Sequence, residues 1–283
     1  MSQQLLAIKS ACSIDLHPVI KWVGGKRQLL HEIKKYIPSG FNRYFEPFIG
    51  GGAVFFSLQQ NGSYISDVNE ELVNLYCTIK YNAVDLLKDL RKHQNTKEYF
   101  LQIRNLDREK QYKQLSDVQK ASRFIYMNRT CFNGLYRVNS KGEFNVPFGA
   151  YHNPRIVDEE NLLACSELLK QTEIRCADFS AILDVVQPND FVYFDPPYIP
   201  LNATSSFTSY TKDGFDVDMQ YRLRDVCNTL HHKDVKFLVS NSDTPLTREL
   251  YSEYNIETVF ASRAINCKAS GRGKITEVLI RNY

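Results

Sequence analysis

The chain has 283 residues, of which 43% are hydrophobic, 12% aromatic and 24% charged, and its 35 Lys and Arg against 32 Asp and Glu leave a net charge of +3. These are the proportions of an ordinary globular protein, so they exclude a disordered or collagen-like chain. A chain of this length buries roughly 75% of the surface that its unfolded form exposes, which is enough for one large core or for a core domain with a smaller insertion.

Membrane and disulfide signals are weak in this sequence. Uninterrupted apolar stretches such as residues 53–56 fall far short of the roughly 20 residues of a membrane helix, and the first twenty residues lack a basic start followed by an apolar run. The seven cysteines are scattered and form no Cys-x-x-Cys pair, which argues against a disulfide framework and against a zinc site. We therefore expect a soluble, cytoplasmic protein without a metal site or a membrane partner.

Strands and helices are predicted to alternate in the first part of the chain. Residues 43–46 lead through a glycine-rich turn into residues 53–60, a pattern typical of a strand, a tight turn and a helix. Residues 64–66 predict a second strand that ends at Asp67, and residues 69–80 predict the helix that follows.

The middle of the chain has a different texture. Ser116 and Gln119 have the spacing of a capping box, which predicts a helix over residues 116–127. Residues 136–146 resemble a β-hairpin with Gly142 in its turn. We expect residues 76–165 to form a mostly helical insertion with one hairpin.

This middle segment is also basic. Residues 76–165 hold fifteen Lys and Arg against ten Asp and Glu, whereas the rest of the chain holds twenty against twenty-two. Most of the excess lies between Lys113 and Arg155, where seven basic residues face only Asp117 and Glu143. An insertion that faces a polyanion is one explanation, and a solvated charged face is the other.

The last part of the chain returns to the alternating pattern. Residues 191–194, 237–240 and 277–280 predict strands, and residues 218–231 predict a helix. Strands that alternate with helices indicate an α/β protein, so residues 1–75 and 166–283 are expected to form one domain around a mostly parallel sheet. Ligands of such sheets bind at the carboxyl ends of the strands.

The glycine-rich turn at Gly50, Gly51 and Gly52 lets a ligand approach the backbone at the start of a helix. Phe55 stands where a dinucleotide fingerprint needs glycine, and no phosphate loop follows. Asp67, seventeen residues after Gly50, ends the next predicted strand, where an acidic side chain of such folds accepts hydrogen bonds from ribose. A ribose-bearing ligand without pyrophosphate fits, and S-adenosylmethionine is one.

The most specific motif is Asp195-Pro196-Pro197-Tyr198, hereafter the Asp-Pro-Pro-Tyr turn, directly after a predicted strand. Its prolines fix a rigid turn that presents two acceptors, the Asp195 carboxylate and the Pro196 carbonyl, and Tyr198 adds an aromatic face. Two acceptors beside a ring suit the exocyclic amine of a planar base, because they orient the amino group and leave its lone pair aimed at an electrophile.

These motifs together resemble the Dam-type DNA adenine-N6 methyltransferases, and among them the Dpn-type members that modify the adenine of GATC. The resemblance covers residues 19–283 and is carried, in this order, by residues 21–26, 45–52, Asp67, 144–149 and 195–198. It implies a Rossmann-like methyltransferase domain with a mixed, mostly parallel seven-stranded sheet, and it implies that residues 76–165 are an inserted DNA-recognition domain.

The resemblance also implies the reaction. Such enzymes transfer a methyl group from S-adenosylmethionine to a flipped-out adenine of duplex DNA, and they act as monomers on DNA in the cytoplasm of a prokaryotic cell or its phage. Some accompany a restriction endonuclease, and the sequence leaves this point open.

Site residues follow from the resemblance position by position. Those implied to act in catalysis are Asp195, Pro196 and Tyr198. Those implied to bind the cofactor are Trp22, Lys26, Phe48, Gly50, Gly52, Asp67, Asp178, Phe179 and Asp195. Those implied to recognise DNA are Lys21, Phe132, Asn133, Leu135, Arg137 and Pro147. In this last set Arg137 would read a guanine, and Phe132, where the family commonly has tyrosine, would intrude into the duplex.

Two other readings remain open at this point. The chain could be a methyltransferase-fold protein that binds DNA without catalysis, or an enzyme that methylates RNA or a protein amide, for which Asn in place of Asp195 is the commoner pattern. Two further loops, at residues 204–210 and 268–274, are candidates for closing over an extruded base and for gripping phosphates.

Overall fold

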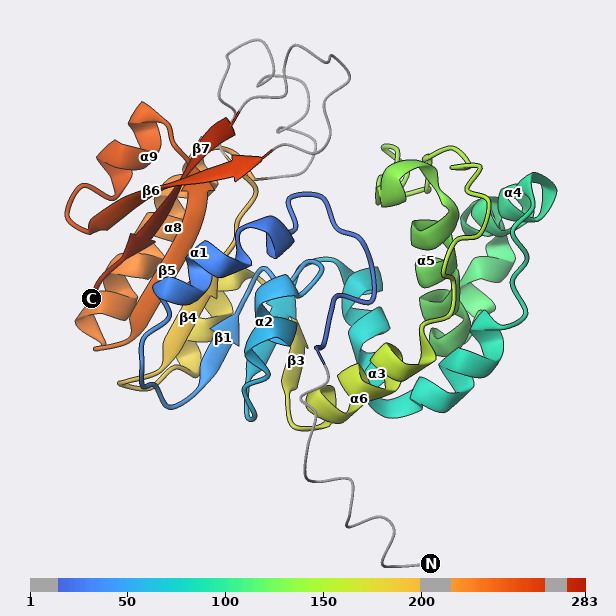
Figure 1. Cartoon of the computed structure of the whole chain (residues 1–283), viewed down its shortest axis with the longest axis horizontal. Coiled ribbons are helices and arrows are strands. Elements are labelled where there is room, and N and C mark those ends of the chain that lie inside the picture. The colour runs from blue at the N-terminus through green and yellow to red at the C-terminus, as the bar shows by residue number, and fades with distance from the viewer. Residues whose placement is uncertain (1–14, 199–214, 263–273) are drawn as a thin grey trace, which may run out of the picture.

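The computed structural model describes residues 15–198, 215–262 and 274–283. A seven-stranded sheet forms one half of the molecule, and helices and loops form the other (Figure 1). The strand order is β3-β2-β1-β4-β5-β7-β6, with β7 antiparallel to both of its neighbours and every other pair parallel. The predicted mixed, mostly parallel seven-stranded sheet is therefore confirmed.

Five of these strands were predicted from the sequence, and the two others are the edge strands of the sheet. The strands are β1 (Tyr44–Glu46), β2 (Tyr64–Asp67), β3 (Glu173–Cys176), β4 (Phe191–Phe194), β5 (Lys236–Ser242), β6 (Asn255–Ser262) and β7 (Lys274–Arg281). Sequence analysis missed β3 and β6, which form the two edges. An edge strand pairs on one side only and tolerates polar residues, so β3 is mostly exposed and lacks an apolar run.

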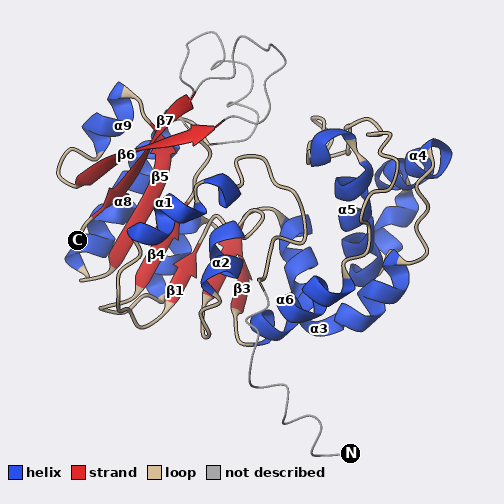
Figure 2. Ribbon diagram, viewed as in Figure 1, coloured by secondary structure: helices blue, strands red, loops and turns tan. Residues whose placement is uncertain are grey.

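The helices of the sheet half are α1 (Leu30–Lys35), α2 (Ala53–Leu58), α8 (Val217–His232) and α9 (Pro245–Leu250). Those of the other half are α3 (Glu70–Leu90), α4 (Lys97–Asn105), α5 (Asp117–Thr130) and α6 (Glu159–Lys170), and we call residues 70–170 the helical region (Figure 2). The predicted capping box is present at the start of α5, where Ser116 and Gln119 satisfy each other's backbone N–H groups. The helix predicted over residues 69–80 forms the first part of α3, which kinks at Asn82 and then continues to Leu90.

Two apolar layers cover the two faces of the sheet. In β4, Phe191 and Tyr193 pack into the layer that holds α2 and α3, whereas Val192 and Phe194 pack into the layer that holds α8. This alternation follows from the two-residue period of a strand. All four side chains are buried because helices cover both faces of a parallel sheet, as Figure 1 shows for α2 and α8.

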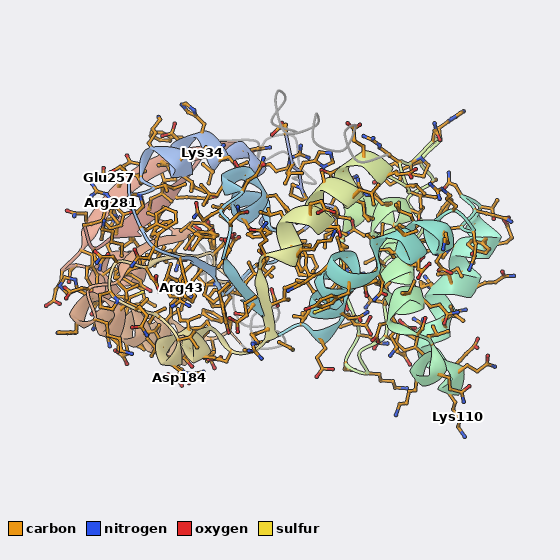
Figure 3. All side chains as sticks on the ribbon, turned by 90° about the horizontal axis from the view of Figure 1, so that it is seen from below. Lys34, Arg43, Lys110, Asp184, Glu257 and Arg281 are labelled. Carbon is orange, nitrogen blue, oxygen red and sulfur yellow. The ribbon has the colours of Figure 1, made fainter. Side chains whose placement is uncertain are left out.

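The helical region shares one of these layers. Buried residues of α3 and α5, such as Leu72 and Phe124, belong to the same apolar cluster as Phe191 of the sheet. A second cluster, built around Phe100 and Tyr126, lies within the helical region itself. Figure 3 shows the length of the molecule: Lys110 stands at the end of the helical region opposite to Arg281 of the sheet.

The two expected domain boundaries fall inside helices. Residues 75 and 76 lie within α3, and residues 165 and 166 lie within α6, so the backbone passes between the two halves through continuous helices. The hairpin predicted over residues 136–146 pairs through one antiparallel bridge, Val138 with Phe144, and Gly142 has a φ of +78° in its turn. No helix among the described residues is long and apolar enough to cross a membrane. The loops at residues 204–210 and 268–273 lie outside the described residues.

Candidate functional site

The glycine turn and the Asp-Pro-Pro-Tyr turn lie side by side because they follow neighbouring strands. Strands β1 and β4 are parallel partners, with Tyr44 opposite Phe191. Strand β1 has β2 on its other side, so the order of the strands along the chain reverses between β1 and β4. Ligands of open α/β sheets bind at such a point, outside the carboxyl ends of the strands. Residues almost 150 positions apart in the sequence thus share one site.

Among the described residues, Asp195 has hydrogen-bond partners at one of its two carboxylate oxygens. Its Oδ1 accepts hydrogen bonds from Nζ of Lys26 at 2.6 Å and from Oγ of Ser240 at 3.0 Å. No hydrogen bond to Oδ2 is found among the residues that the structure describes. Burial raises the pKa of Asp195, and the charge and hydrogen bond of Lys26 oppose that shift. The carboxylate is therefore held in place with one acceptor left for a ligand.

Three other elements hold the rest of this turn. The hydroxyl of Tyr198 donates to Oε2 of Glu277 on β7 at 2.7 Å, and the side-chain amide of Gln220 on α8 donates to the Pro197 carbonyl at 3.1 Å. The Lys26 ammonium lies 4.5 Å from the centre of the Tyr198 ring, within cation–π distance. Lys26 is buried, and it also donates to the Gly24 carbonyl.

Sequence analysis missed these supports. Ser240, Gln220 and Glu277 lie on β5, α8 and β7, far from any motif in the sequence. Ser240 carried the clearest signal, because it is the last residue of a predicted strand and Asp195 directly follows another. The contacts of the other two depend on the antiparallel placement of β7 and on the packing of α8.

The glycine turn has the backbone that its sequence indicates. Gly50 and Gly52 have φ values of +46° and +71°, in the left-handed region that favours glycine. A Cβ atom at Gly50 would lie 2.7 Å from Cδ1 of Trp22, so the indole covers this turn closely. Trp22 and Lys26 are thus both brought to the predicted cofactor site.

Asp67 reaches back to the same turn. Its Oδ2 accepts from the Gly50 N–H at 3.1 Å, and its Oδ1 accepts from the Asn69 N–H at 3.0 Å. A carboxylate can accept about four hydrogen bonds, so these two fix its orientation and leave capacity for ribose hydroxyls.

Glu46 is a buried acid within residues 45–52 to which the sequence motifs assigned no role. It ends β1, and its Oε2 accepts from the Tyr44 hydroxyl at 2.6 Å. Burial raises the pKa of Glu46 to about 8, and the nearby Asp195 carboxylate pushes it in the same direction. A second carboxyl group beside Asp195 is thereby kept largely protonated at neutral pH.

An aromatic surface lies beyond the glycine turn. Phe48 stacks on Phe179 with ring centres 5.2 Å apart, and Phe215 packs on both. Asp178 forms a bidentate ion pair with Arg222. Burial alone would raise the pKa of Asp178, but hydrogen bonds from Ser180 and the charge and hydrogen bonds of Arg222 outweigh burial and lower that pKa. Phe48, Phe179 and Asp178 are therefore neighbours, and the planar rings suit a base of similar shape.

The predicted recognition residues converge on one surface. The Asn128 side chain bonds both the N–H and the carbonyl of Lys21 and also the Gly134 carbonyl, which joins the segment before the glycine turn to the loop after α5. The Lys21 ammonium lies 5.3 Å from the Tyr151 ring centre, and the Tyr151 hydroxyl accepts from the Asn133 N–H.

The same loop pairs with the return strand of the hairpin. The Phe132 N–H donates to the Pro147 carbonyl at 2.9 Å, while the Phe132 ring is 51% exposed. Arg137 is exposed, and its Nε donates to Oδ1 of Asn145 at 2.7 Å. Among the described residues its two terminal nitrogens have no partner, so they are available to a ligand. Leu135 is half-buried between Phe132 and Arg137.

Comparison with known proteins decides the family. A family model described as D12 class N6 adenine-specific DNA methyltransferase matches residues 22–265. The chain belongs to this family. It is a DNA methyltransferase that transfers a methyl group from S-adenosylmethionine to N6 of adenine, and the resemblance stated from its motifs is confirmed.

Relatives of this adenine-N6 methyltransferase cover nearly its whole length. Type II methyltransferase M1.LlaDCHI of Lactococcus lactis subsp. cremoris is 49% identical over 274 residues, which span 95% of this chain and 96% of the relative. The DNA adenine methylase of Vibrio cholerae is 36% identical over 92% of this chain and 94% of its own. That of Escherichia coli K12 is 34% identical over 92% and 93%.

Likeness to solved structures is lower. The human methyltransferase 10 domain containing protein superimposes over 99% of this chain and 92% of its own with a TM-score of 0.41 and 11% identity, which is too low to carry a functional conclusion. The described residues of the adenine-N6 methyltransferase nevertheless suit its cofactor, since the glycine turn, the oriented Asp67 and the paired rings of Phe48 and Phe179 all lie at the carboxyl ends of the neighbouring strands β1, β2 and β3.

Proposed function

We propose that the protein methylates the adenine of GATC in duplex DNA after extruding that base from the helix. The observation that carries this proposal is the Asp195 carboxylate, whose Oδ1 is fixed by Lys26 and Ser240 while Oδ2 has no partner among the residues that the structure describes. An extruded adenine would donate its amino hydrogens to Oδ2 and to the Pro196 carbonyl and would stack on Tyr198. Extrusion costs a few kcal/mol, which contacts of the flipped base offset.

The transfer itself needs positioning rather than covalent catalysis. S-adenosylmethionine would supply an electrophilic methyl group on its sulfonium, and N6 of adenine would take up that methyl group and give one proton to solvent. Trp22, Asp67, Phe48 and Phe179 would hold the methyl donor. Asp195 and Pro196 would stabilise the positive charge that develops on nitrogen, because acceptors already aimed at it need no reorganisation.

Sequence specificity would come from the helical region and from Lys21 beside it. Arg137, whose terminal nitrogens have no partner among the described residues, suits a bidentate contact with O6 and N7 of guanine, which contributes about 1–3 kcal/mol of discrimination. Lys21 would contact the outer guanine, Phe132 would enter the space that the adenine leaves, and Asn133, Leu135 and Pro147 would complete the surface. The excess of basic residues over residues 76–165 supports a nonspecific attraction to phosphates that positions these groups.

A role beside a restriction endonuclease is supported by the name of a relative. One relative is named as a type II methyltransferase, and protection of GATC sites from an endonuclease is the corresponding role here. In that role, as in a solitary one, the enzyme would act as a monomer on DNA in the cytoplasm.

The test is to incubate the protein with S-adenosylmethionine and adenine-unmethylated DNA and to map N6-methyladenine by direct sequencing. We expect marks confined to GATC. Marks at another motif would contradict the assignment of Lys21, Phe132 and Arg137, and no mark from a protein that binds the cofactor would contradict the catalytic role of Asp195.

A further inference from the structure

Three nearly parallel rings connect the glycine turn to the recognition hairpin. The Tyr136 ring lies 4.7 Å from Phe124 and 5.6 Å from Trp22, with interplanar angles of 21° in both pairs. Trp22 in turn covers Gly50 and Gly51. A continuous stack therefore runs from the backbone of the cofactor site to the residue that directly precedes Arg137.

The hydroxyl of Tyr136 makes a second connection. This hydroxyl lies close to Asn69, whose side chain lowers the pKa of Tyr136, while burial acts more strongly and raises that pKa to about 12. The Asn69 N–H donates to the carboxylate of Asp67, and the Asn69 side chain caps α3 through the Leu72 N–H. Both ends of the Tyr136 side chain thus contact residues that touch groups assigned to the cofactor.

Tyr136 and Arg137 point to opposite faces of the hairpin. Successive side chains of an extended strand alternate in direction, and here Tyr136 packs inward on Phe124 while Arg137 and Val138 are exposed. The Arg137 side chain itself is tied to the protein through Asn145, which belongs to the same hairpin. The inward ring is consequently the anchor that relates the hairpin to the rest of the molecule.

We propose that Tyr136 is a positioning residue that sets the aim of Arg137 and couples sequence recognition to the cofactor site. This inference rests on the proposed function, in which Arg137 reads a guanine. A rigid stack fixes the position from which the Arg137 guanidinium would contact a base edge. The same stack transmits any displacement of Trp22 or Asn69 to the hairpin. Such a coupling is reciprocal: cognate DNA tightens cofactor binding by the factor by which cofactor tightens binding of cognate DNA.

The experiment compares three variants of the full chain with the wild type. Tyr136→Leu removes the ring and the hydroxyl, and Tyr136→Phe keeps the ring alone. Tyr99→Leu is the matched control, because Tyr99 is also a tyrosine of the helical region, but its ring and hydroxyl contact His93 and Tyr126. For each protein, kcat/KM is measured on cognate duplex and on duplexes with one substituted base pair. Calorimetry gives the Kd of the S-adenosylhomocysteine product with and without cognate duplex.

For Tyr136→Leu we expect discrimination to fall at least tenfold, at the same guanine where Arg137→Ala loses it. We also expect the effect of cognate DNA on the Kd of S-adenosylhomocysteine to disappear. Tyr136→Phe should keep discrimination within about threefold of wild type, and Tyr99→Leu should keep both properties. A general loss of folded structure would not give this result, because it would lower kcat/KM by the same factor on all duplexes and leave discrimination unchanged.

The proposal is overturned if Tyr136→Leu keeps wild-type discrimination, or if Tyr99→Leu loses as much of it. It is also overturned if Arg137→Ala changes discrimination at no position. Failure of the proposed specificity looks different: wild-type protein would then methylate adenine in another motif. The Tyr136 proposal then holds only if Arg137→Ala and Tyr136→Leu lose discrimination at the same base pair of that motif.

Discussion

The site at the carboxyl ends of β1 and β4 and the predicted recognition surface around Arg137 differ in how they hold charged groups. Lys26, Asp195 and Glu46 are enclosed and contact or influence one another, whereas Lys21, Arg137 and their neighbours are exposed. Catalysis by positioning requires charged groups held at set places away from water. Recognition of DNA requires groups that reach outward to phosphates and base edges. The comparison teaches that burial, more than residue type, separates the two tasks in this protein.

The two regions also differ in how their titrating groups respond to burial. In the sheet half, burial holds a proton on Glu46, whose pKa is raised to about 8. In the helical region, burial keeps a proton off His93, whose pKa is lowered to about 4 and whose ring nitrogens bond Tyr99 and Ser122. In both cases the neutral form is favoured, but one group has gained a proton and the other has lost one.

The largest expected effect separates catalysis from folding. Asp195→Ala should abolish methyl transfer and leave the thermal unfolding temperature close to that of the wild type, because the open acceptor is lost while Lys26 can turn to water. Activity is measured with labelled S-adenosylmethionine on unmethylated DNA. The matched control is Asp184→Ala, an exposed carboxylate of the same half (Figure 3), which should keep full activity. Substantial turnover by folded Asp195→Ala would sink the assignment.

The next effect belongs to the recognition surface. Arg137→Ala should lower discrimination at one guanine by ten- to a hundredfold, which corresponds to about 1–3 kcal/mol, with cofactor affinity unchanged. Competition between cognate and singly substituted duplexes gives the ratio. Lys110→Ala removes an equal charge from the far end of the helical region (Figure 3) and should leave the ratio unchanged. An equal loss on all duplexes would mark Arg137 as a phosphate contact.

A smaller effect tests whether Ser240 holds the Asp195 carboxylate in position. Ser240→Ala removes one hydrogen bond to Oδ1 of Asp195 while the Lys26 pair remains, so we expect kcat to fall about tenfold with KM for DNA nearly unchanged. Ser242→Ala, on the same strand but with its hydroxyl near Asn241, is the control and should lose less than twofold. If both variants behave alike, Ser240 does not position Asp195.

The smallest effect is a dependence of stability on pH with opposite signs in the two regions. Glu46 binds its proton more tightly when folded, so its contribution to the unfolding free energy falls as pH rises from 4.5 to about 8. His93 binds its proton less tightly when folded, so its contribution falls as pH drops from 6.5 to about 4.

Denaturant unfolding across this range measures both contributions. Glu46→Gln should flatten the upper part of the profile, and His93→Gln should flatten the lower part. Unchanged profiles in both variants would show that neither buried group governs the response to pH.

Local patterns in the sequence were sufficient for much of this description. Short runs of apolar, β-forming residues predicted the central strands, a capping box predicted the start of α5, and two turn motifs predicted where the chemistry lies. Each of these signals depends on residues within a few positions of one another. The domain boundaries at residues 75/76 and 165/166 carried no such signal, and the structure runs α3 and α6 through them.

Only the tertiary structure decided which distant groups meet. The sequence by itself determined the fold class, the family and the two motifs, because these are written in local spacing. Strand order and helix packing decide the contacts that hold the site. They bring Ser240 to Asp195 and Glu277 to Tyr198, bury Glu46 so that it keeps its proton, and stack Tyr136 on Trp22. A one-dimensional pattern does not encode such contacts, because they join residues that are brought together only when the sheet and the helical region share one core.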